Sequence, residues 1–395
     1  MFGGVLADQP TVDDALGYQK ASEALANIII DENTDTPLTI GVFGEWGVGK
    51  TSFLKMIEER IPSEKYSTVW FDPWRYDEKQ VIQAALIQTI LAKIDQTTTD
   101  EGFRRQIIEL SAKFLALIAA KVTEVATSGL VKPIELFNEA KQIIKPGFEE
   151  IRSWNEIDRT FERVVNIHVG KEGRLIIFID DLDRCMPENA IQVLEAIKLF
   201  LAQKNCVFVL GVDKQGIENA ISLRYRDNPQ MSGVRYLEKI IQIPFFLPQP
   251  DPDNIKVFTQ SFLGETTVYQ TQRVISAGAV NNPRRIKRFI NTLSLLRAIA
   301  SDKDLEEPVL AKIVIIQSLF PEFFQILCNE PEAIRHLMEL SKAEQPSESP
   351  KYNVYKKFLD KQELIAFLIK TRDINPRYDL WDSYLHLATI GGDSG

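Results

Sequence analysis

The stretch "GVFGEWGVGKTS", residues Gly41–Ser52, decides how this chain of 395 residues is expected to fold. It overlaps a short apolar run, Leu38–Phe43, which follows Pro37 and is typical of a buried strand. After Lys50 the apolar residues recur at helical spacing, at Phe53, Leu54, Ile57 and Ile61. The segment therefore predicts a strand, a glycine-rich turn and a helix, which is the context that the pattern G-x-x-x-x-G-K-S/T requires.

Phosphate binding explains why these residue types occur together. Glycine lets the backbone curl so that successive N–H groups approach an anion closely. The following helix adds its free N–H groups and the positive end of its dipole. Lys50 is expected to reach the β- and γ-phosphates, and the Thr51 hydroxyl to ligate Mg²⁺. The full set of expected nucleotide-binding residues is Gly44, Glu45, Trp46, Gly47, Val48, Gly49, Lys50, Thr51 and Ser52. A glycine-rich surface turn with a chance lysine is the alternative, and the flanking strand and helix disfavour it.

A second stretch, "RLIIFIDDLDRC" at Arg174–Cys185, supplies carboxylates for the same site. Its uninterrupted apolar run, Leu175–Ile179, indicates a strand buried on both faces of a parallel sheet. Acidic residues follow at the carboxyl end of that strand, where open α/β sheets place ligands. We assign Asp180 to Mg²⁺ and Asp181 to the attacking water, and Asp183 is the reserve candidate for the second role. The alternative is that these acids only cap the next helix.

Five apolar runs, each separated by a helical stretch, predict the strands of the sheet: Leu38–Phe43, Thr68–Phe71, Leu175–Asp180, Cys206–Gly211 and Ile240–Phe245. This alternation implies a parallel sheet with helices on both faces, an α/β three-layer sandwich. An N-terminal helical segment is expected over residues 1–36, with a helix at Ala15–Ile30. In a C-terminal helical region over 306–395, helices are expected at Pro308–Gln325, Glu332–Leu340 and Tyr355–Lys370.

Composition and charge limit the class of protein. Hydrophobic residues make up 45% of the chain and charged residues 26%, which is ordinary for a soluble globular protein. The net charge of -9 argues against broad non-specific DNA binding, because that needs a basic surface. Three cysteines without metal-binding spacing, and a start without a signal-peptide pattern, favour a cytoplasmic protein.

Four blocks of the sequence carry a resemblance to one family: FGEWGVGKTS, VWFDPWRYD (Val69–Asp77), IIFIDDLDRC and YLEKIIQIPFFLP (Tyr236–Pro248). The chain resembles the KAP family of P-loop NTPases, which is named for a kidney ankyrin-repeat protein and bacterial phage-exclusion proteins. Trp46 inside the loop and the acidic string are specific to that family rather than to P-loop proteins in general. The resemblance implies a P-loop NTPase core over residues 37–249, a five-stranded sheet of order 5-1-4-3-2, and ATP with Mg²⁺ as cofactors. It also implies an all-helical lid over residues 250–305.

The same resemblance implies further site residues. Asp213, at the end of "VFVLGVD", matches the position of a polar sensor beside the γ-phosphate, and a helix N-cap is an equal alternative. In "NNPRRIKRFIN" (Asn281–Asn291), a lid helix is expected to bring Arg284 or Arg285 back onto the phosphates. A solvated basic face is the alternative there. The candidates for a cation that acts on a neighbouring subunit are Arg184, Arg235 and Lys239.

The interval 103–170 is expected to be a helical insert in the core. Many members of the family carry transmembrane helices in this interval. Here Lys113, Lys121 and Glu124 interrupt the apolar stretch, and uncharged runs of about seven residues fall short of the roughly 20 that a span needs. We therefore expect a soluble helical hairpin and no transmembrane span, with an amphipathic helix on a membrane surface as the alternative.

The expected function is that of a Mg²⁺-dependent ATPase that acts as a conformational or assembly switch. The resemblance suggests a role in bacterial anti-phage defence. It implies ATP, further copies of the chain, and a protein effector or phage component as partners. Two alternatives stay open: a scaffold that binds ATP with little turnover, and an ATPase or translocase stimulated by nucleic acid. The acidic balance and the lack of a basic aromatic channel disfavour the translocase.

Overall fold

The computed structural model describes residues 5–79, 82–125, 148–170, 172–200, 203–225, 232–263, 269–278, 282–300, 305–342 and 350–391. The chain divides into two compact units, which we describe separately. The sheet unit consists of Gln19–Trp46 and Lys50–Pro248. The helical unit consists of Met1–Tyr18, Gly47–Gly49 and Gln249–Gly395. The tip of the glycine loop thus belongs to the helical unit, whereas both ends of that loop belong to the sheet unit.

The sheet unit is built on five parallel strands in the order β2-β3-β4-β1-β5, which confirms the predicted order. The strands are β1 (Leu38–Phe43), β2 (Ser67–Phe71), β3 (Leu175–Asp180), β4 (Cys206–Val212) and β5 (Ile243–Phe246). Every residue of β1, β3 and β4 is buried, as expected for inner strands of a parallel sheet. The predicted start of β5 at Ile240 is wrong, because Ile240 and Ile241 are held in a helical turn by hydrogen bonds to the Leu237 carbonyl.

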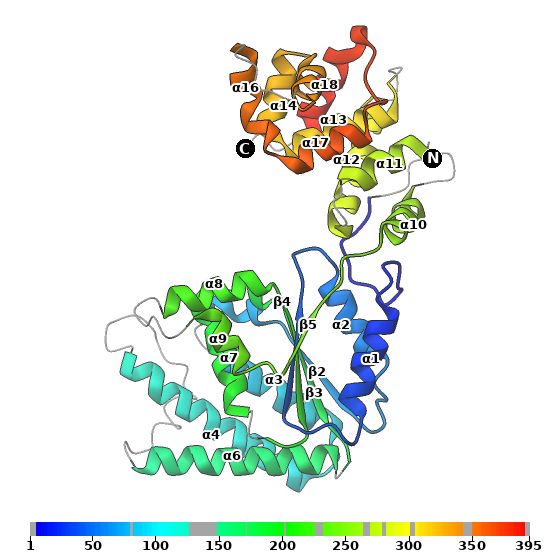
Figure 1. The fold of residues 1–395 in the computed structure, drawn as a ribbon. Coiled ribbons are helices and arrows are strands. Elements are labelled where there is room, and N and C mark those ends of the chain that lie inside the picture. The colour runs from blue at the N-terminus through cyan, green and yellow to red at the C-terminus, as the bar shows by residue number, and fades with distance from the viewer. Residues whose placement is uncertain are drawn as a thin grey trace. The chain divides into compact units, whose positions relative to one another are not determined.

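Helices cover both faces of this sheet, so the predicted three-layer sandwich is confirmed (Figure 1). One face carries α1 (Gln19–Ile30) and α2 (Lys50–Glu59). The other carries α3 (Ile82–Thr97), α7 (Pro187–Phe200), α8 (Lys214–Arg224) and α9 (Gly233–Glu238). The predicted start of the first helix at Ala15 is wrong. The Asp14 carboxylate binds the N–H groups of Leu16 and Gly17 in a turn that precedes α1.

The insert contributes two long helices that pack against each other, α4 (Glu101–Val125) and α6 (Phe148–Val169). The connection that the hairpin prediction requires between them lies outside the described residues. Among the helices that the structure describes, none combines the length and apolar character needed to cross a membrane.

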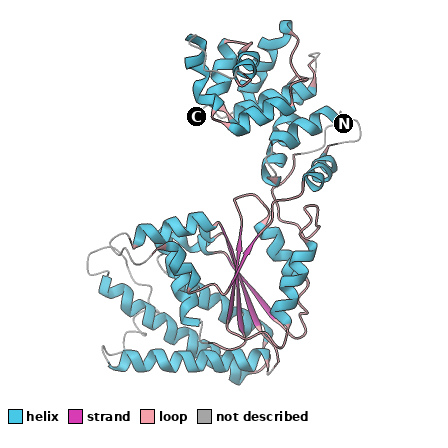
Figure 2. Cartoon of the chain, in the orientation of Figure 1, coloured by secondary structure: helices cyan, strands magenta, loops and turns pink. Residues whose placement is uncertain are grey.

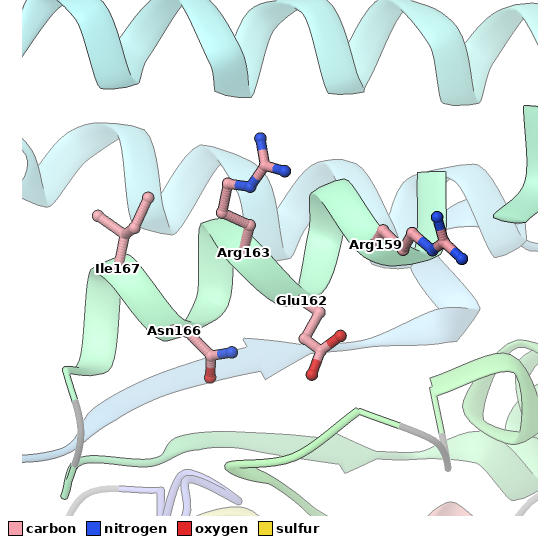
Figure 3. Close-up of a pocket in the computed structure, with 5 residues that line it drawn as sticks. All are labelled: Arg159, Glu162, Arg163, Asn166 and Ile167. Carbon is pink, nitrogen blue, oxygen red and sulfur yellow. The ribbon is translucent and has the colours of Figure 1, made fainter. Parts of the chain in front are cut away.

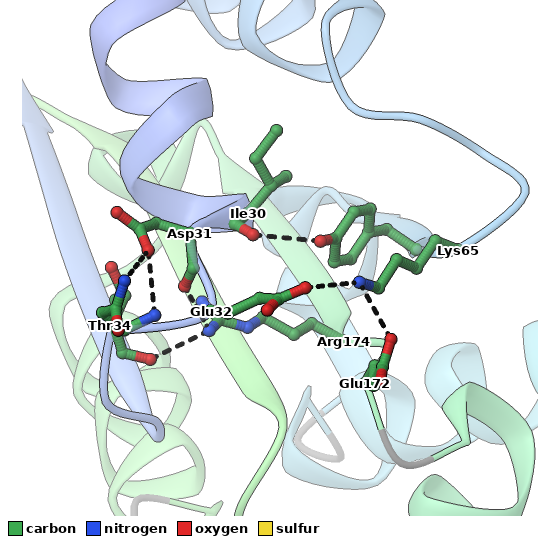
Figure 4. A network of polar contacts seen from close by, with 9 residues as sticks. Ile30, Asp31, Glu32, Thr34, Lys65, Glu172 and Arg174 are labelled. Carbon is green, nitrogen blue, oxygen red and sulfur yellow. Dashed lines mark hydrogen bonds and ion pairs between the residues drawn. The ribbon is translucent and has the colours of Figure 1, made fainter.

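Arg174, the residue before β3, links the start of this strand to the end of α1 and the loop that follows it (Figure 4). Its buried guanidinium donates three hydrogen bonds of 2.6–2.9 Å to the carbonyl oxygens of Ile29, Asp31 and Thr34. Beside it, the Tyr66 hydroxyl donates to the Ile30 carbonyl at 3.0 Å. These bonds satisfy carbonyl groups at and beyond the end of α1 that the helix itself leaves without partners.

The described residues of 249–391 form helices and no strands (Figure 2). The helices are α10 (Pro252–Phe262), α11 (Tyr269–Gly278), α12 (Pro283–Ile299), α13 (Glu307–Leu319), α14 (Pro321–Asn329), α15 (Ala333–Leu340), α16 (Pro350–Leu359), α17 (Gln362–Lys370) and α18 (Trp381–Gly391). Their core is centred on α13, in which residues 308–316 are all buried. Lys312 of α13 is fully buried, and it donates to the carbonyls of Thr371 and Ile374 and to the Asn375 side chain.

Two predicted helices of this region are wrong in extent. The expected helix Pro308–Gln325 is two helices, because Pro321 has no N–H group to continue α13 and instead begins α14. The expected helix Tyr355–Lys370 is likewise split, since the Gln362 N–H group bonds to the Asp360 carbonyl in a turn between α16 and α17.

Candidate functional site

The glycine loop joins β1 to α2, as the sequence predicted. Lys50 is the first residue of α2, and its ammonium group donates to the carbonyls of Gly44 at 2.9 Å and Glu45 at 3.3 Å. The Lys50 side chain is buried, so these carbonyls provide the partners that a buried charge requires. The Gly44 N–H group donates in turn to the Val212 carbonyl of β4 at 3.3 Å, which ties the start of the loop to the neighbouring strand.

Two glycines at the tip of the loop have backbone conformations that favour glycine. Gly47 has φ 85° and Gly49 has φ 108°, both in the left-handed region. Within the helical unit, a Cβ atom at Gly47 would lie 2.8 Å from Oδ1 of Asn282. The carbonyl of Val48, between the two glycines, accepts a hydrogen bond of 3.0 Å from the Tyr18 hydroxyl.

Asp180 and Thr51, the predicted magnesium ligands, are brought together. Asp180 is the last residue of β3, and its carboxylate lies beside the Thr51 side chain in the first turn of α2. Burial raises the pKa of Asp180 to about 6, although the neighbouring Thr51 side chain opposes the shift. Oδ1 of Asp180 is buried without a hydrogen-bond partner. A Cβ atom at Gly211, the residue opposite on β4, would lie 2.6 Å from this oxygen, so glycine leaves room for the carboxylate.

Asp181 follows in a left-handed conformation with φ 56°, which is uncommon for a residue with a side chain. Nε of Arg184 lies 2.9 Å from Oδ1 of Asp181. Burial raises the pKa of the Asp181 carboxyl, the Arg184 charge opposes that shift, and the charges of Asp183 and Asp72 add to it. The Arg184 guanidinium also lies 5.6 Å from the centre of the Trp46 ring. Arg184 therefore has partners within its own chain, whereas the sequence suggested it for a neighbouring subunit.

The remaining acids of this edge differ in their surroundings. Oδ1 of Asp183 is buried without a hydrogen-bond partner. Asp72, after β2, forms an ion pair with Arg75 at 3.0 Å. Asp213 caps α8 by accepting from the Gln215 N–H group at 3.2 Å, which is the N-cap alternative of its two predicted roles. The Asp213 cap and the pair at Asp72 are ordinary structural contacts.

The predicted lid arginines lie in the first turn of α12. The Asn282 side chain caps this helix and accepts from the N–H groups of Arg284 and Arg285. The Arg284 N–H group is also 3.4 Å from the Gly47 carbonyl, within the helical unit. The Arg284 guanidinium forms an ion pair with Asp8. Arg285 is exposed, and among the described residues it has no ion pair.

Residues 18–300 of the chain match the family model described as the KAP family P-loop domain. The chain belongs to the KAP family. It is 26% identical to the phage T7 exclusion protein of Escherichia coli over 266 residues, which cover 62% of this chain and 34% of that protein. It is 36% identical over 56 residues to the kinase D-interacting substrate of 220 kDa from Rattus norvegicus, and to the same extent to the one from Homo sapiens. That match covers 14% of this chain and 3% of each relative, so the KAP chain spans about a third of the first relative and a small part of the others.

Solved structures similar to this KAP chain include one protein from Aeropyrum pernix and one from Thermotoga maritima. The Aeropyrum pernix ORC2 protein is 14% identical with a TM-score of 0.43, and the match covers 97% of this chain and 88% of that one. Thermotoga maritima RuvB is 11% identical with a TM-score of 0.38, and the match covers 92% and 90% of the two chains.

A pocket elsewhere in the KAP chain does not add to this site. It has a volume of about 410 Å³ and is lined by five residues of α6: Arg159, Glu162, Arg163, Asn166 and Ile167 (Figure 3). Glu162 and Arg163 point in opposite directions in Figure 3, so the polar groups do not converge on one point. We assign no ligand to this pocket.

Two residues that contact the loop of this KAP chain were not among the predicted site residues. Asn282 could have been found, because an asparagine before Pro283 is a recognisable helix cap. Tyr18 carries no such signal, since its partner Val48 lies 30 residues away and no motif links them.

Proposed function

We propose that this KAP chain binds ATP with Mg²⁺ at the glycine loop and hydrolyses the β–γ phosphoanhydride. The observation that carries the proposal is the position of Thr51, in the first turn of α2, beside Asp180 at the end of β3. It sets a hydroxyl beside a buried carboxylate whose Oδ1 has no hydrogen-bond partner. These donors fit Mg²⁺, which prefers oxygen ligands and binds through one or two protein groups together with water and substrate phosphates.

The residues around this pair have separate roles in the proposed reaction. The Lys50 ammonium exchanges the loop carbonyls for β- and γ-phosphate oxygens, and the N–H groups of the loop after Gly44 surround the phosphates. Mg²⁺ held by Thr51 and Asp180 would supply positive charge that offsets the negative charge of the phosphates. Asp181 accepts a hydrogen bond from the attacking water, with Asp183 as the reserve. The water oxygen bonds to the γ-phosphorus as the bond to the bridging oxygen breaks, so ADP and phosphate leave and a proton passes to solvent.

We further propose that Arg284 or Arg285 contacts the phosphates when ATP is bound. Support comes from the contact between the first turn of α12 and Gly47 at the tip of the loop. Arg285 is exposed and has no ion pair among the described residues, whereas Arg284 would first have to leave Asp8. Either movement would link the nucleotide to the helices beyond residue 250.

We propose a biological role as an ATP-dependent switch in phage exclusion, with further copies of the chain and a protein effector or phage component as partners. The support is the similarity to the phage T7 exclusion protein, whose length this chain covers by 34%. The competing functions are a scaffold that binds ATP with little turnover and an ATPase stimulated by nucleic acid. The net charge of -9 disfavours the second of these.

The rate of ATP hydrolysis separates these functions when it is measured at several protein concentrations, with and without DNA or RNA. We expect Mg²⁺-dependent turnover that rises per chain with protein concentration and does not respond to nucleic acid. Lys50→Ala should abolish turnover, whereas Lys55→Ala, on the same helix beside Trp70, should not. ATP binding without turnover would favour the scaffold, and stimulation by nucleic acid would favour the translocase.

A further inference from the structure

Tyr18 is the last residue before α1, and its side chain is 2% exposed. Its hydroxyl donates to the Val48 carbonyl at 3.0 Å, and its ring lies 3.5 Å from the position that a Cβ atom on Gly49 would occupy. These residues all belong to the helical unit. Burial, reinforced by the charge of Asp14, raises the pKa of the Tyr18 phenol. The hydroxyl therefore keeps its proton and remains a donor through the neutral pH range.

The hydrogen bond from Tyr18 to the Val48 carbonyl also restricts the direction of the Gly49 N–H group, which belongs to the same peptide. In a trans peptide the carbonyl and the following N–H group point in opposite directions. Holding the Val48 carbonyl towards Tyr18 therefore turns the Gly49 N–H group to the other side of the loop. Gly49 has φ 108°, and glycine rotates between backbone conformations at little steric cost, so the loop itself does not fix this peptide.

We propose that Tyr18 is a positioning residue for phosphate binding: its hydroxyl holds the Val48–Gly49 peptide so that the Gly49 N–H group faces the phosphates. The proposal rests on the proposed function, since it needs a phosphate in the loop. It assigns Tyr18 a role towards the phosphate chain and none towards the base.

The segment before Tyr18 is itself held in place. The Asp14 carboxylate accepts from the N–H groups of Leu16 and Gly17 at 3.0 and 2.8 Å. Gly17 has φ 83°, and the Asn254 side chain of α10 donates to the Leu16 carbonyl at 3.2 Å. The phenol is therefore carried by a turn with fixed hydrogen bonds, as a positioning residue requires.

The test is Tyr18→Phe, which removes the hydroxyl and leaves the ring. Tyr66→Phe is the matched control, because Tyr66 is also buried and its hydroxyl donates to the Ile30 carbonyl at the same distance of 3.0 Å. The full chain is titrated with ATP in the presence of Mg²⁺, and inorganic tripolyphosphate is titrated as a competitor that has no base. Thermal unfolding of both variants shows whether each one is folded.

We expect Tyr18→Phe to lower the affinities for ATP and for tripolyphosphate by the same factor. That factor should be about three- to tenfold, as for the loss of one hydrogen bond. Tyr66→Phe should leave both affinities unchanged. Weaker ATP binding with unchanged tripolyphosphate binding would overturn the proposal, because it would place Tyr18 at the base. Unchanged affinity for both ligands would also overturn it. If the unmodified chain binds neither ligand, the proposed function fails instead.

Discussion

Nε of Arg184 lies 2.9 Å from Oδ1 of Asp181, three residues earlier in the chain, and the same guanidinium faces the Trp46 ring at 5.6 Å. Asp181 is in a left-handed conformation and is surrounded by the like charges of Asp72 and Asp183. Arg184 therefore offsets those charges more than Lys50 does, and Trp46 connects Arg184 to the glycine loop.

Arg184→Ala should raise the pKa of Asp181, because it removes a charge that now opposes the shift due to burial. If ionised Asp181 accepts the hydrogen bond from water, turnover is lost as the pH falls through its pKa. The acid limb of the pH–rate profile should then move to higher pH, and the maximal rate should fall about ten- to a hundredfold. Arg184→Lys, which keeps the charge, should move the acid limb less than Arg184→Ala does. An acid limb that lies at the same pH in the Arg184→Ala variant as in the unmodified chain would contradict this account.

The buried carboxylate of Asp180, which the proposed Mg²⁺ site needs, should destabilise the folded chain when no ligand is bound. Its pKa is about 6 in the folded chain and 3.8 in a free side chain, so the folded state binds more protons between these values. Stability therefore falls as the pH rises from about 4 to 6, and at pH 7 the cost is about 1–3 kcal/mol. Asp180→Asn should accordingly raise the unfolding temperature without ligand at pH 7 and abolish the stabilisation by Mg²⁺ with ATP. A lower unfolding temperature without ligand would show that Asp180 is a net stabilising residue.

The ion pair between Asp8 and Arg284 should compete with phosphate for the arginine. Both side chains are partly exposed, so the pair is worth less than about 1 kcal/mol, and releasing it should tighten ATP binding by about two- to fivefold. Asp8→Asn is the test, and Asp13→Asn removes the same charge from an exposed neighbour as the control. In an Arg284→Ala background, Asp8→Asn should have no effect. An equal gain in both backgrounds would mean that Asp8 acts by some route other than Arg284.

The motifs and the inner strands could be predicted because their signals are local. The bounds of β1 and β3 follow from uninterrupted apolar runs, and the Thr51–Asp180 pair follows from two motifs on strands of one sheet. The start of β5 could not, because Ile240 and Ile241 are as apolar as the strand but are buried in a turn. The pairings of Tyr18 with Val48 and of Asp8 with Arg284 join residues far apart in the sequence. Such contacts depend on the folded chain and leave no periodic pattern.

Arg174 should be a main determinant of the stability of the sheet unit. Arg174→Met keeps much of the apolar stem but removes the guanidinium from three carbonyl groups, of which only that of Asp31 keeps another donor, the Thr34 N–H group. We therefore expect a loss of about 2–4 kcal/mol. Lys65→Met, which removes exposed ion pairs with Glu32 and Glu172 beside it, should have a much smaller effect, because solvent screens exposed ion pairs. Urea unfolding measures both. Equal effects of the two substitutions would refute the capping role of Arg174.

The central claim, Mg²⁺-dependent hydrolysis of ATP at the edge formed by Thr51, Asp180 and Asp181, is tested most directly with Asp181→Asn. The substitution keeps the shape of the side chain but weakens the acceptor for the attacking water, while Thr51 and Asp180 remain in place. ATP binding and single-turnover hydrolysis should be measured on the same preparation. We predict ATP affinity within about threefold of the unmodified chain, and a hydrolysis rate at least about a hundredfold lower, the contribution expected of a general base. Hydrolysis by Asp181→Asn at the unmodified rate, or no ATP binding by the unmodified chain, would contradict the account.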